Sequence, residues 1–158
     1  MEYGLLLLRL VVGLLFAAHG SQKLFGWFGG GGPQGTTAFF ASLGFRMPAA
    51  MAILAGLSEL GGGLLLASGF LTPLASLLLA TVMLNAIATV LWPKGLIGGY
   101  EFELTLLTVA ITLAATGPGR VSIDHAIGWD DNITGIAWAS LVLAAAIVVS
   151  LLTTTIGR

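Results

Sequence analysis

The chain has 158 residues, of which 57% are hydrophobic and only 8% are charged, and its formal net charge is −1. A soluble domain carries about 25% charged residues, so this composition excludes a water-soluble globular protein and places most of the chain in lipid. The lack of a clustered basic face argues against a nucleic-acid partner, and the lack of cysteine excludes disulfides, thiolate catalysis, iron–sulfur clusters and cysteine-ligated zinc within this chain.

Five apolar stretches are long enough to cross a membrane, which takes roughly 20 helical residues. In chain order they are residues 4–22, 48–69, 73–92, 101–116 and 133–155. The first has neither a basic leader nor a clear cleavage site, so we expect a retained helix rather than a signal peptide. Proline and glycine end the stretches, and short connections favour antiparallel neighbours.

This pattern predicts an all-α membrane protein. Residues 1–124 are expected to form an antiparallel four-helix transmembrane bundle, and residues 125–158 an interfacial linker and a fifth C-terminal transmembrane helix. With five spans, four basic residues share one side of the membrane: Lys23, Arg46, Lys94 and Arg158. The positive-inside rule then places the loop between the first two spans in the cytoplasm.

That loop, "HGSQKLFGWFGGGGPQGTT" (residues 19–37), is rich in glycine. It contains a GxGxxG match and a near match to a phosphate-binding loop. A membrane helix precedes it where a strand is required, however, and no lysine is placed for a phosphate. We expect instead a flexible interfacial lid, anchored in the lipid head groups by Phe25, Trp27 and Phe28, above His19 and Lys23.

Four of the apolar stretches carry polar side chains at helical spacing, which puts them on one face of each helix. These faces contain Arg9, Phe16, His19 and Lys23; then Ala52, Gly56, Glu59 and Gly63; then Thr81, Asn85 and Thr89; and then Glu101, Thr105, Thr108 and Thr112. Because charged groups inside a membrane usually face a protein interior, we expect all four stripes to line one polar cavity beneath the loop.

Several roles within this cavity stay open from the residues alone. Arg9 either pairs with Glu59 at the base of the cavity or extends to the nearer interface. Glu59 is either paired or protonated. His19 either lines the cavity or caps the interface, and Asn85 and the threonines either bind a ligand or join helices. Four further polar residues are interpreted as solvated loop residues: Asp124, His125, Asp130 and Asp131.

Metal and haem sites are not predicted. A bis-histidine haem requires two facing histidines in the bilayer, and only His19 is near a helix. Zinc requires three or four ligands, and the spacing of His19, Glu59 and Glu101 does not demand such a site.

Three segments, "RLVVGLLFAAHGSQKLFGWFGGGGPQGTTAFFASLG", "ELGGGLLLASGFLTPLA" and "GYEFELTLL…TGPGRVSID", resemble the DoxX family of small integral membrane proteins, in the expected order from Leu5 to Asp124. The fifth apolar stretch extends beyond the family's four-helix core. The resemblance carries the family motifs onto Arg9, Gly13, His19, Gly20, Lys23, Leu24, Glu59, Gly62, Gly63, Gly69, Thr72, Tyr100, Glu101, Gly117, Pro118, Gly119, Ser122 and Asp124.

The family is named for subunits of an archaeal thiosulfate:quinone oxidoreductase, and a mycobacterial member is described as linking superoxide dismutase to a thiosulfate sulfurtransferase. The resemblance therefore implies a quinone-linked redox subunit or a member of an oxidative-stress complex in a prokaryotic cytoplasmic membrane. The alternative is a non-enzymatic scaffold that anchors partner proteins. A small transporter is disfavoured, because we find no inverted repeat and no broken helix.

On the redox hypothesis, the expected ligand is an isoprenoid quinone and the expected partner a soluble redox protein or sulfurtransferase, with a homo-oligomer also possible. The candidate catalytic residues are Glu59, His19 and Glu101. The candidate ligand-binding residues are Arg9, Lys23, Asn85, Trp27 and Tyr100.

Overall fold

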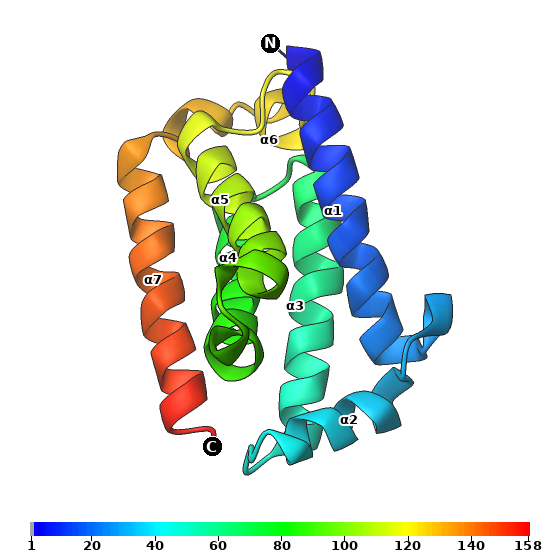
Figure 1. Cartoon of the computed structure of the whole chain (residues 1–158). Helices are drawn as coiled ribbons and strands as arrows, with labels where there is room; N and C mark the ends of the chain where they lie inside the picture. The colour runs from blue at the N-terminus through cyan, green and yellow to red at the C-terminus, as the bar shows by residue number, and fades with distance from the viewer. Residues whose placement is uncertain (1) are drawn as a thin grey trace.

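The computed structural model describes residues 2–158 as a helical bundle with five helices long and apolar enough to cross a membrane (Figure 1). These are α1 (Glu2–Phe25), α3 (Pro48–Ser68), α4 (Thr72–Ala86), α5 (Glu101–Thr116) and α7 (Ile136–Thr155). Short helical turns extend α4 to Lys94 and precede α5 from Leu96, so that the third span covers residues 72–94 and the fourth covers residues 96–116. The predicted all-α membrane fold and its five spans are confirmed.

A shorter helix, α2 (Gly32–Ser42), lies across one end of the bundle, which we call the α2 end (Figure 1). The prediction of a single loop over residues 19–37 is therefore wrong. Helix α1 continues to Phe25, and Pro33 in the first turn of α2 favours a new helix start. The loop is confined to residues 26–31, where Gly26 and Gly29 have positive φ angles of 73° and 76°.

Helices α1 and α3 pack closely along faces of small residues. A Cβ atom on Gly13 would lie 2.5 Å from the Gly63 carbonyl oxygen, and one on Gly20 would lie 2.7 Å from the Gly56 carbonyl oxygen. Neither position has room for a side chain, so glycine lets the two backbones touch. These contacts fix the register between α1 and α3.

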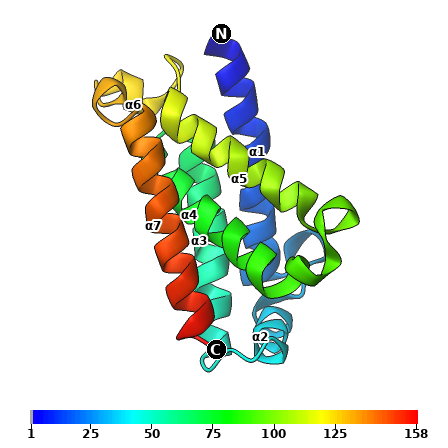
Figure 2. The ribbon, with the colours of Figure 1, turned by 60° about the vertical axis from the view of Figure 1, so that its left-hand side comes forward.

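The main apolar core lies between the spans. It includes Phe16 of α1, Leu66 of α3, Leu79 of α4, Leu113 of α5 and Ala146 of α7. Helix α7 lies alongside α4 and α5 in both views (Figures 1 and 2), and it therefore contributes to the bundle core.

The C-terminal part of the third span departs from regular α-helix. Residues Ile87–Leu91 form a π-helical turn, followed by a 3₁₀ turn at Trp92–Lys94 and a second, kinked π-helical turn at Leu96–Tyr100. This connection to α5 projects from the bundle (Figure 2), and the Trp92 and Tyr100 rings stack across it with centroids 5.7 Å apart. Single π-helical turns occur often at functional sites.

At the opposite end of the bundle, a buried carboxylate connects the short helix α6 to the start of α4. Asp124, in the short helix α6 (Ile123–Ala126), accepts hydrogen bonds from the backbone N–H of Leu71 at 2.8 Å and from the backbone N–H and hydroxyl of Thr72 at 3.0 and 2.7 Å. The prediction that Asp124 is a solvated loop residue is wrong, because it caps the start of α4 and is fully buried.

Replacing Asp124 with alanine should lower the free energy of unfolding by about 3 kcal/mol, because three donors would lose their acceptor in a buried place. Equilibrium unfolding in mild detergent measures this. Asp131→Ala, in the same connection but exposed, is the control and should change stability by about 0.5 kcal/mol at most. Equal effects of the two substitutions would contradict the capping role.

The neighbouring His125 is exposed, as predicted, and its Nδ1 lies 2.6 Å from Oδ2 of Asp130. The hydrogen bond from His125 lowers the pKa of Asp130 below its ordinary value. The stability that this pair contributes is therefore present above the ordinary aspartate pKa, and it is lost as the pH falls through the lowered one.

Candidate functional site

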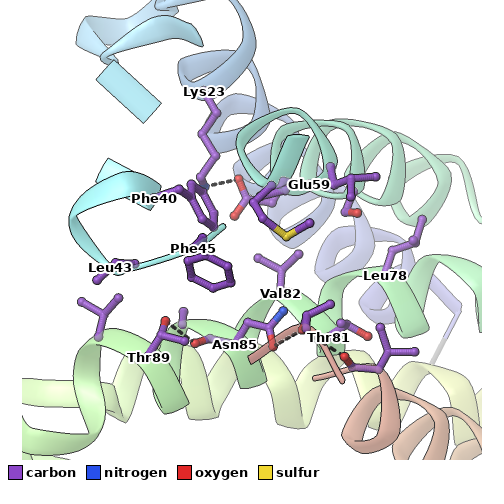
Figure 3. Close-up of a pocket in the computed structure, with 18 of the residues that line it drawn as sticks. Lys23, Phe40, Leu43, Phe45, Glu59, Leu78, Thr81, Val82, Asn85 and Thr89 are labelled. Carbon is purple, nitrogen blue, oxygen red and sulfur yellow. Dashed lines mark hydrogen bonds and ion pairs between the residues drawn. The ribbon is translucent and has the colours of Figure 1, made fainter. Parts of the chain in front are cut away.

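A cavity of about 480 Å³ lies at the α2 end, between α2, α3 and α4, with side chains from α1, α5 and α7 reaching into its wall (Figure 3). Most of its lining is apolar, and Phe39 and Phe40 of α2 and Phe45 form part of it. The polar lining residues are Lys23, Ser58, Glu59, Thr81, Asn85, Thr89, Glu103 and Thr153. An apolar cavity of this size with a few polar groups is the ordinary form of a small-molecule site.

One side of the cavity is formed by an ion pair between Lys23 Nζ of α1 and Glu59 Oε2 of α3 (Figure 3). Glu59 lies midway along α3, and its side chain is only 4% exposed, whereas that of Lys23 is 28% exposed. The ammonium group compensates the charge of a carboxylate that is almost completely buried. Of the two alternatives for Glu59, the structure shows the paired one.

The predicted Arg9–Glu59 pair is wrong. Arg9 is buried at the opposite end of the bundle, where its guanidinium donates to the Val121 carbonyl and fills the space beside Gly69. Gly69 lies ten residues after Glu59, which corresponds to about 15 Å along a helix. The glycine contacts between α1 and α3 thus bring Lys23, and not Arg9, within reach of Glu59. The guanidinium does reach the loop end of the bundle, beside Val121 and Gly69, but it is buried there among protein groups.

The opposite side of the cavity is formed by α4, and here the predicted polar stripe of Thr81, Asn85 and Thr89 faces the cavity (Figure 3). The Asn85 amide oxygen accepts hydrogen bonds from the hydroxyls of Ser150 at 2.6 Å and Thr153 at 3.1 Å, both on α7. Since these bonds hold the oxygen, the amide nitrogen is turned toward the pocket in Figure 3, and residues 2–158 give it no hydrogen-bond acceptor. Asn85 therefore joins two helices and also offers a donor to the cavity.

The predicted stripe on α5 does not face the cavity. Glu101, Thr105, Thr108 and Thr112 are all exposed on the outside of the bundle. Thr105 and Thr108 donate to carbonyl oxygens of their own helix at 2.8 Å, which lets threonine face lipid at little cost. The buried face of α5 contains Leu107, Ala110 and Ala114, and Glu103 belongs to it by its spacing.

Glu103 is thus a cavity residue that the sequence analysis missed. Its Oε2 atom is buried and has no hydrogen-bond partner among the residues that the structure describes. The signal that could have found it was the apolar periodicity of α5, because the more apolar face of a helix in a bundle with many small residues is the buried one. Ser58, Phe39, Phe40 and Thr153 were missed as well.

The remaining candidate residues do not line the cavity. His19 is half-buried, and its Nδ1 lies 3.0 Å from Oε1 of Gln22. Trp27 is exposed beside Phe25, with ring centroids 5.0 Å apart, and Tyr100 stacks on Trp92. Within residues 2–158 no group of three or more histidine or acidic side chains is placed to hold a metal ion.

Comparison with known proteins supports the resemblance seen in the sequence. The DoxX family model matches residues 4–92, which is more than half of the chain. The chain belongs to the DoxX family. The match in this DoxX protein spans α1 to α4 and so includes Lys23, Glu59 and Asn85, whereas Glu103 and the α7 residues that bind Asn85 lie beyond it.

Three curated proteins resemble this DoxX protein over most of their length. The Bacillus subtilis (strain 168) protein named "Putative oxidoreductase CatD" is 37% identical over 123 residues, covering 78% of this chain and 86% of that protein. Escherichia coli (strain K12) "Inner membrane protein YphA" is 30% identical over 77% of this chain and 88% of that protein. "Inner membrane protein YqjF" of the same organism is 31% identical over 78% of this chain and 92% of that protein. No solved structure matches this chain.

Proposed function

We propose that this DoxX protein binds a quinone in the cavity at its α2 end and acts as the membrane subunit of a quinone-linked redox system. The observation that carries the proposal is the pairing of two features. An apolar cavity of about 480 Å³ is open between helices, and among its few polar groups are a Lys23–Glu59 ion pair on one side and the Asn85 amide on the other.

These residues fit a quinone head group. Its two ring oxygens accept hydrogen bonds, and Lys23 Nζ and the Asn85 amide nitrogen are donors on opposite sides of the cavity. The rings of Phe40 and Phe45 and the aliphatic side chains would contact the flat ring and the start of an isoprenoid tail. A bound quinone would supply two-electron, two-proton chemistry, for which this cysteine-free chain has no group of its own.

Glu59 has two roles in this proposal. Its carboxylate holds the Lys23 ammonium at the edge of the cavity, and it is placed to receive a proton from that ammonium or return one to it. His19 and Glu101 have no place in this step, because neither lines the cavity. Electrons would come from a soluble redox or sulfurtransferase partner. The name of the Bacillus relative supports the redox class, and the two Escherichia coli names support a prokaryotic cytoplasmic membrane.

Replacing Asn85 with leucine should weaken binding of a short-chain quinone to the detergent-solubilised protein about fivefold. The substitution removes one of the two donors, and a hydrogen bond of this kind contributes about 1 kcal/mol. Isothermal titration calorimetry measures the Kd. Asn132→Leu, the same change in an exposed loop, is the control and should bind like the wild type. Saturable binding that is equal in all three proteins would contradict the assigned site.

A scaffold function is the second candidate, and the outer face of α5 favours it. Glu101, Thr105, Thr108 and Thr112 form a polar stripe on a surface that otherwise faces lipid. Such a stripe suits lateral contact with a partner's membrane helix. The test places cysteines at positions 105 and 112. On this hypothesis they would cross-link a stoichiometric partner or a second copy. A protein that carries quinone but shows no cross-link at either position would favour the redox function alone.

A further inference from the structure

The exposed part of the cavity wall is apolar. Three of the described lining residues are exposed, namely Phe39 of α2, Leu54 of α3 and Val149 of α7, at 46%, 55% and 40%. Every polar lining residue is less exposed than these three. An exposed residue in a cavity wall lies where the cavity meets its surroundings, and the apolar side chains of membrane spans are the ones that face lipid. The rim of the cavity therefore adjoins hydrocarbon.

Two of the rim residues lie at a similar depth in the membrane-spanning part of the bundle. Leu54 is six residues from the start of α3 at Pro48, and Val149 is six residues from the end of α7 at Thr155. Both of these helix ends lie at the α2 end (Figure 1). Helices of 21 and 20 residues match the hydrocarbon thickness of a bilayer. Since six helical residues extend about 9 Å, both rim residues lie within the hydrocarbon.

Helices α3 and α7 border this part of the cavity from two sides. In the described residues, α7 packs against α4 and α5, whereas α3 packs against α1, α2 and α4, so α3 and α7 are joined mainly through α4. At the α2 end the gap between them is closed by two contacts. The backbone N–H of Arg46 donates to the Gly157 carbonyl at 2.8 Å, and Arg158 Nε donates to the Leu43 carbonyl at 2.9 Å. The gap is thus closed toward the head groups and faces sideways.

We propose that the cavity opens into the bilayer between Leu54 and Val149, and that its ligand enters through this side opening and keeps its apolar chain there. The inference rests on the proposed function and adds where the tail of the quinone lies. The head group lies deeper, between Lys23 and Asn85 (Figure 3). A hydrocarbon chain between apolar side chains leaves no polar group without a partner. The ligand class is therefore a lipid with a small polar ring and a chain.

Photolabelling tests this with a quinone that carries a diazirine on the first unit of its chain, using the full-length protein in detergent. Label that excess unmodified quinone prevents should lie on α3 and α7, next to Leu54 and Val149, by peptide mass spectrometry. The double variant Leu54→Trp, Val149→Trp should reduce this label at least about fivefold, because the indoles occupy the space of the chain. Leu57→Trp, Val148→Trp is the matched control, since these residues are similarly exposed but do not line the cavity.

Calorimetry with a chainless quinone separates this inference from the function on which it rests. If the wild type binds neither the chainless quinone nor the photoreactive one, the proposed function fails. If the chainless quinone binds but the protectable label is missing or lies on α1 or α5, the cavity assignment stands and the side opening is wrong. Equal label in the two double variants would also overturn the side opening. Should a double variant lack a cooperative thermal transition, Leu54→Trp is compared with Leu57→Trp instead, and equal label there would overturn it as well.

Discussion

Lys23→Met should lower the free energy of unfolding by about 3 kcal/mol, because it leaves the Glu59 carboxylate without a cation near the middle of the bundle. The Glu59 side chain is only 4% exposed, so bulk water solvates it poorly and does not replace the lost ammonium group. Reversible unfolding of the detergent-solubilised protein, followed by circular dichroism, measures the loss.

The double variant Lys23→Met, Glu59→Leu should regain most of that stability. Replacing both members of a buried ion pair with apolar residues of similar volume is often neutral or stabilising. The double variant should nevertheless lose quinone binding, since it removes the polar groups from one side of the cavity. Stability that falls further in the double variant than in Lys23→Met would contradict the inference that the loss in Lys23→Met comes from an uncompensated Glu59 carboxylate.

Gly13→Ala should have an effect of similar size through a different cause. The added Cβ would lie 2.5 Å from the Gly63 carbonyl oxygen and 2.7 Å from the Ala67 backbone nitrogen, and neither backbone atom can move without separating α1 from α3. Overpacking of this kind costs about 1–3 kcal/mol and more where backbone is involved, so we expect a loss of about 3 kcal/mol by the same unfolding measurement.

The matched control for that substitution is Gly61→Ala, because nothing lies within 4 Å of a Cβ at that position. Alanine favours helix over glycine by about 1 kcal/mol, so this variant should be as stable as the wild type or more stable. Similar destabilisation by both substitutions would mean that the α1–α3 contact is not as close as described, and the register that brings Lys23 to Glu59 would then lose its support.

The spans and the stripe on α4 could be predicted from the sequence because apolar length and helical spacing are local properties. The stripe on α5 could not, since threonine satisfies its hydroxyl with its own helix and then faces lipid as readily as protein. The spacing of the polar residues identified one face of α5, whereas the buried face, which includes Glu103, is marked by the spacing of its apolar residues.

The partner of Glu59 also could not be predicted. Estimating depth from the ends of apolar stretches put Arg9 close to Glu59, but register is set by which glycines touch, and that is a property of two helices together. The role of Asp124 was hidden in the same way. Its partners, Leu71 and Thr72, lie more than fifty residues away in the sequence.

The most direct test of a quinone site in this cavity is mass spectrometry of the lipids extracted from the gently purified wild type and from the double variant Lys23→Met, Glu59→Leu. We predict a near-stoichiometric isoprenoid quinone or quinol in the wild type and none above background in the equally well-folded double variant. A wild type that carries only bulk phospholipid, or the same amount of quinone in both proteins, would contradict the assignment of the cavity as a quinone site.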